Sequence, residues 1–283
     1  MARCAALHVA VAWGRTLCDG PGMSDAVLYR PASADGVGLL TLNRPAERNS
    51  MTAELLDAFA ATIPIVRGDA ALRCLVLTGS GTCFSSGADL TKQIQRADGS
   101  RLPHEASYAM YTPFLSLLDV EVPVVGALNG HAVGGGFGLS LLCDLRVGNV
   151  EARYGANFTR LGLHPGLGIA YLLPRLIGHA QAVELLYTGR LVDGREAERL
   201  GLLRAVPATE VLPAATALAQ EIARAAPLAV RSTKATLRQH LAWDIRAAAQ
   251  REAFAQAATI QTDDFKEGMA ALLGKREPSF QGR

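Results

Sequence analysis

Four glycines fall within five consecutive residues of the stretch GHAVGGGFGLSLLCD, residues 130–144. Gly134, Gly135 and Gly136 are adjacent, and Gly138 follows one residue later. A glycine inside a helix costs about 1 kcal/mol relative to alanine, so a cluster needs a reason. Either the backbone packs closely there, or a ligand lies against bare N–H groups. The first N–H groups of a helix have no intrahelical partner and carry positive potential, which suits a developing negative charge.

A second turn of small residues occurs in FSSGADL, residues 84–90, and also leads toward a helix. Neither turn has the G-x-G-x-x-G spacing of dinucleotide-binding proteins, the lysine of a phosphate-binding loop, or a G-x-S-x-G nucleophile motif. Two separate loops that each offer an N–H donor at a helix start can form an oxyanion hole. We interpret Asp89 as a helix cap and loop brace rather than an acid, because Asp is common at helix starts.

Alternating and continuous apolar runs predict the elements that position these turns. Strands are expected at 37–43, 73–79, 123–130 and 145–149. Helices are expected after Thr52, from about Asp89, over 105–118, and from the glycine cluster onward. Strand–turn–helix units in this order indicate an α/β fold with ligand chemistry at the turns.

The pattern changes after about residue 207 to alanine-rich helices, expected at 209–225, 228–240, 242–261 and 263–274. We therefore expect a core domain over 26–206 and a helical region over 207–283 that docks on the core or on another subunit. Residues 1–25 contain a short apolar run that is interrupted by Trp13-Gly14-Arg15. We expect these residues to be a disordered or non-native extension, with Met23 as the natural start.

Composition excludes several classes of protein. The 283 residues are 49% hydrophobic and 19% charged, with a net charge of +2, so binding to nucleic acid through bulk charge is not expected. Five cysteines without C-x-x-C spacing indicate reduced thiols in a cytoplasmic protein, not disulfides or a zinc site. No run of about 18 apolar residues predicts a membrane span.

Several motifs together resemble the crotonase, or enoyl-CoA hydratase/isomerase, superfamily over about residues 27–280. They are LNRPAERNSMTAELL, FSSGADL, PVVGALNGHAVGGGFGLSLLCDLRV, LGLHPGLGIAYLLPRLIG, TGRLVDGREAERLGLL and DDFKEGMAALLGKREPSF. The resemblance implies a spiral of ββα repeats with a C-terminal helical trimerisation region, often assembled as a dimer of trimers. It implies an acyl-CoA thioester substrate and no cofactor, since coenzyme A is part of the substrate. By motif position, the backbone N–H groups of Ala88 and Gly135 would bind the thioester oxygen.

The chain departs from the hydratases of this superfamily at two positions. Where those enzymes carry two glutamates that handle water, this chain has Gly138 and Phe158. The region near Gly166, where some isomerases keep an acid, is also apolar. Because neither residue transfers a proton, hydration by the two-glutamate mechanism is excluded. Restoring both glutamates is expected to raise hydratase activity, provided that the pocket tolerates two carboxylates.

Other groups remain as candidates for proton transfer and substrate binding. His164 in LHPG is a competent base near neutral pH, although a loop histidine bonded to backbone is the favoured interpretation, and His131 is expected to face away. Arg48, Lys92 and Lys275 are the cations expected near the phosphates of coenzyme A, with Lys275 reaching a neighbouring active site. The other residues expected to line the site are Ser86, Asp89, Leu90, Gly134, Gly138, Phe158 and Gly166.

Two classes of function compete. The first is an enzyme that stabilises a thioester enolate, including a decarboxylase or an isomerase with a different acid or base. The sequence also resembles a branch that decarboxylates glutaconyl thioesters, for which Lys92 or Arg96 would supply the basic residue, but helix 242–261 lacks that branch's histidine. The second is a non-catalytic acyl-CoA-binding protein. Retention of both oxyanion donors favours an enzyme, because binding alone does not need preorganised charge stabilisation.

Overall fold

The computed structural model describes residues 24–88 and 102–283. Its main sheet has six strands in the order β1-β2-β3-β5-β7-β10, parallel except for the antiparallel pair β1–β2. These strands are β1 (Val27–Arg30), β2 (Val37–Leu42), β3 (Cys74–Gly79), β5 (Val124–Leu128), β7 (Leu145–Asn149) and β10 (Arg204–Val206). Every residue of β3 and β5 is buried, which explains why both read as continuous apolar runs rather than alternating ones.

A second sheet of four short strands lies beside the first, in the order β4-β6-β8-β9. It contains β4 (Cys83–Ser85), β6 (His131–Val133), β8 (Arg153–Gly155) and β9 (Val192–Asp193). Successive repeats contribute one strand to each sheet, as in β3/β4, β5/β6 and β7/β8. The predicted α/β class and the spiral of repeats are thereby confirmed, whereas the two- and three-residue strands were not predicted.

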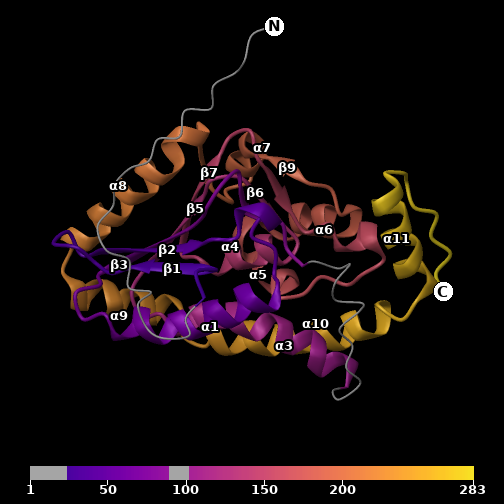
Figure 1. The fold of residues 1–283 in the computed structure, drawn as a ribbon, viewed down its shortest axis with the longest axis horizontal. Coiled ribbons are helices and arrows are strands. Elements are labelled where there is room, and N and C mark those ends of the chain that lie inside the picture. The colour runs from indigo at the N-terminus through magenta and orange to yellow at the C-terminus, as the bar shows by residue number, and fades with distance from the viewer. Residues whose placement is uncertain (1–23, 89–101) are drawn as a thin grey trace, which may run out of the picture.

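Helices cover the sheets on several sides (Figure 1). Among the described residues before residue 200, the α-helices are α1 (Ala53–Gly68), α3 (Pro103–Leu115), α4 (Gly135–Leu142), α5 (Ile169–Ile177), α6 (His179–Thr188) and α7 (Gly194–Arg199). Thr52 caps α1 as predicted, since its side chain accepts the Leu55 N–H at 3.3 Å. Single-turn 3-10 helices include η4 (Phe158–Leu161).

The C-terminal helices are α8 (Val211–Arg224), α9 (Pro227–Leu237), α10 (Leu241–Thr259) and α11 (Asp263–Gly274), close to their predicted ranges. α8 packs on the main sheet, where Val76, Val125 and Val147 meet Val211 and Ala215 in a second, smaller core. α10 packs along α3, and α11 packs on η4. In Figure 1, α8 and α9 lie at one end of the molecule, and α11 with the C-terminus lies at the other.

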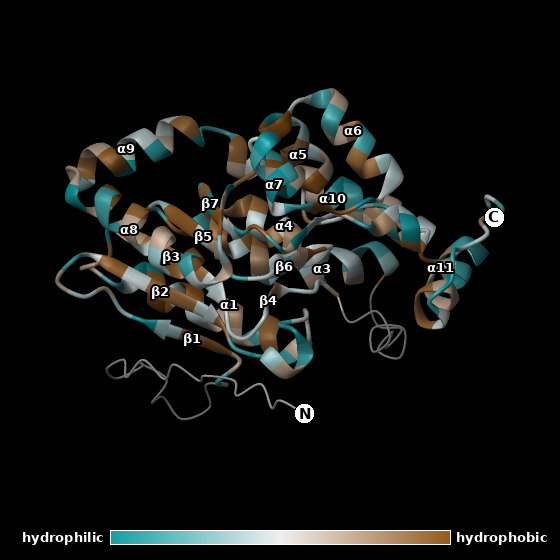
Figure 2. Ribbon diagram, turned by 90° about the horizontal axis from the view of Figure 1, so that it is seen from above, coloured by the Kyte–Doolittle hydropathy of each residue, from teal (hydrophilic) through white to brown (hydrophobic). Residues whose placement is uncertain are grey.

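Buried charge ties α9 to the core. Lys234 is 8% exposed, and its ammonium donates to the Val122 carbonyl at 2.6 Å and pairs with Asp144 at 2.9 Å. Arg238 pairs with the other oxygen of Asp144 at 2.8 Å. Figure 2 shows that the strands of the main sheet are largely apolar, while polar residues are more frequent on the surrounding helices. Within the described ranges, no helix has both the length and the apolar character that a membrane crossing requires.

Candidate active site

The start of α4 is built from glycine for several distinct reasons. Gly134 precedes the helix with φ of 57° and ψ of −124°, a conformation that side chains disfavour. A Cβ at Gly136 would overlap the backbone oxygen of Ser85, so this glycine allows backbone to pack on backbone. A Cβ at Gly135 would instead meet the thioether of Met51, the movable end of a flexible side chain. Close packing against the backbone therefore explains why residue 136 is glycine. It does not explain Gly135, because the Met51 side chain that occupies the space beside Gly135 could move.

The two glycine-containing turns meet at Gly87 and Gly135. Gly87 has φ of +80°, and a Cβ built on it would lie 2.6 Å from the Val133 oxygen and 3.0 Å from the Gly135 nitrogen. Ala88 follows Gly87 directly, so the fold brings the two candidate donors to one place. Gly134 N–H bonds to the Gly155 oxygen at 2.9 Å. Neither the Gly135 N–H nor the Ala88 N–H has a hydrogen-bond acceptor among the described residues.

The turn at residues 48–51 holds the loop that ends in Ala88. The Ser86 N–H donates to the Arg48 oxygen at 3.0 Å, and the Met51 N–H donates to the Gly87 oxygen at 2.9 Å. The Ser85 hydroxyl donates to the oxygen of Asn49 at 2.8 Å. Two loops far apart in sequence are thus joined by backbone groups on both sides, which fixes the position of the Ala88 N–H.

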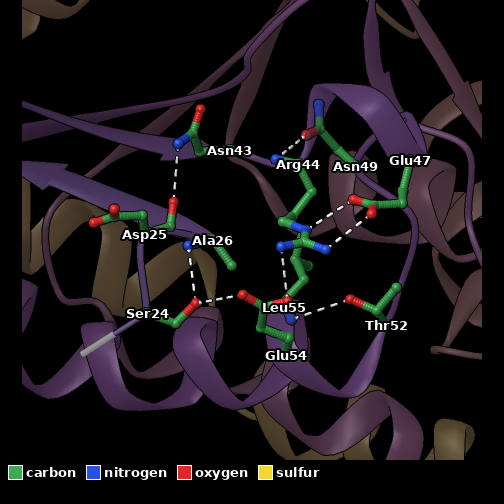
Figure 3. Close-up of polar contacts among 10 residues, drawn as sticks. All are labelled: Ser24, Asp25, Ala26, Asn43, Arg44, Glu47, Asn49, Thr52, Glu54 and Leu55. Atoms are coloured by element: carbon green, nitrogen blue, oxygen red, sulfur yellow. Dashed lines mark hydrogen bonds and ion pairs between the residues drawn. The ribbon is translucent and has the colours of Figure 1, made fainter. Parts of the chain in front are cut away.

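Asn49 and Arg44 hold this turn in shape (Figure 3). The Asn49 side chain accepts the Arg44 N–H at 2.8 Å and donates to the Cys83 oxygen at 2.8 Å. The Arg44 guanidinium forms ion pairs with Glu47 and Glu54, both at 2.8 Å. Arg48 and Asn49 both adopt positive φ, at 53° and 51°. The motif NRPAERNSMT therefore shapes the site through the backbone conformation of this turn. The Arg48 side chain is exposed to solvent beside the site.

The opposite wall of the site is apolar. A Cβ at Gly138 would lie 2.7 Å from Cδ2 of Leu167 and 3.2 Å from Cδ1 of Ile169. Leu167 is fully buried and has φ of 64°. Phe158 is buried in η4, with its ring tip 3.9 Å from the Cβ position of Gly134. Hydrophobic side chains therefore fill the space at Gly138 and Phe158, the two positions expected to hold glutamates in hydratases of the superfamily.

The two candidate histidines both bond to backbone. The His164 Nδ1 lies 2.6 Å from the Pro165 oxygen, and the backbone N–H of His164 donates to the Thr259 hydroxyl at 3.1 Å. If Nδ1 carries the proton, Nε2 is left as an acceptor. His131 is exposed, and its Nδ1 accepts the Arg153 N–H at 2.9 Å. Both contacts are those of histidines that stabilise their loops.

α10 carries a row of polar groups that the sequence analysis did not single out. The Glu252 carboxylate accepts the N–H groups of Gly168 at 2.6 Å and Ala170 at 2.9 Å, and thereby caps α5. Burial raises the pKa of Glu252 to about 7, against the opposing effect of those two hydrogen bonds. The Gln256 amide donates to the Tyr111 hydroxyl at 2.9 Å and to the His164 oxygen at 3.1 Å. The sequence gives no signal for either residue, because polar side chains are spread around this helix.

A comparison with known proteins identifies the family. The family model for enoyl-CoA hydratase/isomerase matches residues 32–283. The putative enoyl-CoA hydratase/isomerase YngF of Bacillus subtilis is 36% identical over 92% of this chain and 100% of its own length. A crystal structure of an enoyl-CoA hydratase/isomerase from Pseudoalteromonas atlantica has a TM-score of 0.80 at 31% identity, covering 90% of this chain and all of that one. The chain belongs to the enoyl-CoA hydratase/isomerase family.

Not all structural relatives in this enzyme family are named as hydratases. The ECH2 decarboxylase domain of CurF from Lyngbya majuscula matches with a TM-score of 0.76 at 26% identity, covering 87% of this chain and 99% of that domain. Membership of the enoyl-CoA hydratase/isomerase family is therefore compatible with reactions other than hydration.

The remaining candidate residues of this family member fall into two groups. Ser86 is half-buried in the loop before Ala88, and Lys275 is exposed at the end of α11, with φ of 51°. The other cations and loop residues named from the sequence, Asp89, Leu90, Lys92 and Arg96, lie outside the described residues. The structure thus brings Ala88, Gly135, Phe158 and Gly138 together with two side chains that the sequence did not indicate, Met51 and Tyr111.

Proposed function

We propose that the protein is an acyl-CoA enzyme that stabilises a thioester enolate with the N–H groups of Ala88 and Gly135. The observation that supports this most is the meeting of the two turns, with the Gly135 nitrogen 3.0 Å from the Cβ position of Gly87. Both N–H groups lack an acceptor among the described residues, and backbone hydrogen bonds to the turn at residues 48–51 hold the loop before Ala88. Donors that are fixed before the reaction stabilise developing charge without reorganisation, and losing one typically costs about 10²–10³ in rate.

The apolar wall limits which reaction follows. Hydration needs one group to take a proton from water and a second to protonate the α-carbon. At Gly138 and Phe158 this chain has no carboxylate, and Leu167 fills the space beside Gly138. The site is therefore suited to a reaction in which the enolate forms without a strong base.

Decarboxylation is the second candidate because it meets that condition. The bond between the α-carbon and the departing carboxylate breaks, CO₂ leaves, and the electron pair remains as the enolate. A single proton at the α-carbon then completes the product, and no base is required. The likeness to the CurF decarboxylase domain adds to this candidate. An isomerase, or an acyl-CoA-binding protein without activity, would be the alternatives if decarboxylation of every acyl-CoA tested were absent.

The first prediction is that the purified protein binds acyl-CoA thioesters. Isothermal titration with crotonyl-CoA is expected to show saturable binding, because the oxyanion donors and the exposed cations of the rim are retained. Arg48→Ala is expected to weaken binding several-fold through loss of a cation at the phosphates, whereas Arg204→Ala, an exposed residue on β10, is expected to leave it unchanged. An absence of binding at millimolar ligand would rule out the proposed function.

The second prediction is that the chain assembles through residues 207–283 as a trimer or a dimer of trimers. Large apolar side chains stay exposed on these helices, including Leu228 at 77%, Leu237 at 76% and Trp243 at 72%. A patch of this kind typically marks an interface. Sedimentation is expected to give about 90 kDa or its double, from a chain of 29.9 kDa. A clean monomer peak would contradict the assembly.

A further inference from the structure

The structure points to Tyr111 as the proton donor of this site. We infer that its hydroxyl protonates the α-carbon of the enolate held at Ala88 and Gly135, and this inference rests on the proposed function. The sequence offered His164 as a candidate acid or base, because Gly138 and Phe158 have no group that can transfer a proton. Tyr111 lies on α3, separated in sequence from both glycine-containing turns, and only the fold brings it to them.

The position of the ring supports this assignment. The side chains nearest to the Cβ position of Gly135 are those of Met51 and Tyr111, with Cε1 of Tyr111 at 3.8 Å. The Tyr111 hydroxyl oxygen lies 2.5 Å from the Cβ position of Gly166. The ring therefore runs from the start of α4 to the Gly166 loop, beside the proposed donor of Gly135. Tyr111 is 1% exposed, so its hydroxyl faces protein or ligand rather than bulk water.

The hydrogen bond that the Tyr111 hydroxyl donates is a long one. Nε2 of Gln256 donates both to the Tyr111 oxygen at 2.9 Å and to the His164 oxygen at 3.1 Å. With the amide turned that way, the acceptor for the phenolic proton among the described residues is Oε1 of the same amide, at 3.2 Å. One amide group serves poorly as both donor and acceptor to one hydroxyl. A buried donor with so weak a partner is uncommon and is expected where a ligand completes the network.

The proposed step balances. The electron pair of the enolate takes the phenolic proton, so a C–H bond forms at the α-carbon while the O–H bond of Tyr111 breaks. The negative charge moves from the thioester oxygen to the phenolate, which the N–H of Gln256 stabilises. Water restores the phenolic proton after the product leaves. Burial raises the pKa of Tyr111, so the group stays protonated at neutral pH and acts as an acid.

Exchange of the α-hydrogens of butyryl-CoA in D₂O tests the assignment. By microscopic reversibility, the phenolate of Tyr111 removes the α-hydrogen in the reverse step, so exchange by the wild-type protein is expected to exceed the buffer rate and to rise with pH. Tyr111→Phe is expected to reduce this exchange at least 10²-fold, the usual contribution of a general acid or base, while the Kd for butyryl-CoA stays within about twofold. Mass spectrometry of the thioester measures the exchange.

Controls separate a chemical role from a structural one. Tyr29→Phe removes the hydroxyl of another buried tyrosine, bonded to Asp69 at 2.7 Å on the far edge of the main sheet, and is expected to leave exchange unchanged. Gln256→Leu keeps the phenol and removes its partner, so a smaller loss is expected, and this variant serves if Tyr111→Phe does not fold. Exchange by Tyr111→Phe at the wild-type rate would overturn the assignment. So would a wild-type protein that binds butyryl-CoA without any exchange, whereas a failure to bind would count against the proposed function.

Discussion

Purified protein is expected to hydrate crotonyl-CoA far more slowly than the typical enzymatic range of about 1–10³ s⁻¹. Each positioned acid or base usually contributes about 10²–10⁴-fold. Neither Gly138 nor Phe158 supplies one, and Tyr111 as the proposed acid still leaves the attacking water without a base. The burial of Phe158 also removes polar partners that a water molecule would need there. The proposed oxyanion donors would still polarise the thioester, so a small rate above background is expected. Loss of absorbance of the conjugated thioester measures the rate.

A gain-of-function series makes this expectation sharper. Gly138→Glu with Phe158→Glu would restore two carboxylates, but any side chain at residue 138 meets Leu167 at 2.7 Å and Ile169 at 3.2 Å. The double variant is therefore expected to lose stability and gain little activity. Adding Leu167→Ala opens the space, and hydration is expected to rise at least tenfold over the double variant. Ordinary turnover by the wild-type protein would show that another residue of the site serves as the base for water.

The free energy of unfolding is expected to fall as the pH rises from about 4.5 to about 7. Burial raises the pKa of Glu252 from 4.5 to about 7, so the folded state binds a proton more tightly than the unfolded state in that interval. As the pH rises, the Glu252 carboxyl ionises first in the unfolded state, and this ionisation favours unfolding. The free energy of unfolding therefore decreases until the carboxyl also ionises in the folded state. The expected loss is on the order of 3 kcal/mol.

Denaturant unfolding at several pH values checks this, with Glu252→Gln as the test variant. Glutamine cannot ionise, so its unfolding free energy is expected to lack this part of the pH dependence. It also loses an acceptor for the N–H of Gly168 or Ala170, so we expect it to be less stable than the wild-type protein at pH 5. Glu221→Gln changes an exposed carboxylate on α8 and is expected to follow the wild-type curve. Parallel curves for all three proteins would refute the role of Glu252.

The sequence was most informative where a pattern extends over many residues. The apolar runs at 74–79 and 124–128 became central strands, and the alanine-rich C-terminal ranges became helices of nearly the predicted extent. The strands β4, β6, β8 and β9 have two or three residues each, too few to show a period. Glycine spacing indicated both turns, because only glycine fits backbone packed on backbone, as at Gly136.

Side chains contributed by distant helices could not be predicted in the same way. Glu252 and Gln256 lie in AAAQREAFAQAAT, where polar residues are spread around the helix and mark no single face. Their burial follows from the packing of α10 on α3 and α5, which is a tertiary event. Tyr111 was missed for the same reason, since only that packing places its hydroxyl beside Gly166.

The turn at residues 48–51 has a consequence for how this protein tolerates change. Because backbone groups of the turn hold the loop before Ala88, and because the proposed donors are themselves backbone N–H groups, replacing the side chain of Ala88 leaves its donor in place. Scanning mutagenesis by alanine would pass over such a site. A one-residue deletion between Ser85 and Ala88 would instead shift the donor out of register. The proposed oxyanion donors thus depend on the length of this loop and on glycines such as Gly87. Relatives that lost the activity are therefore expected to differ by insertions or deletions in this loop more often than by substitutions.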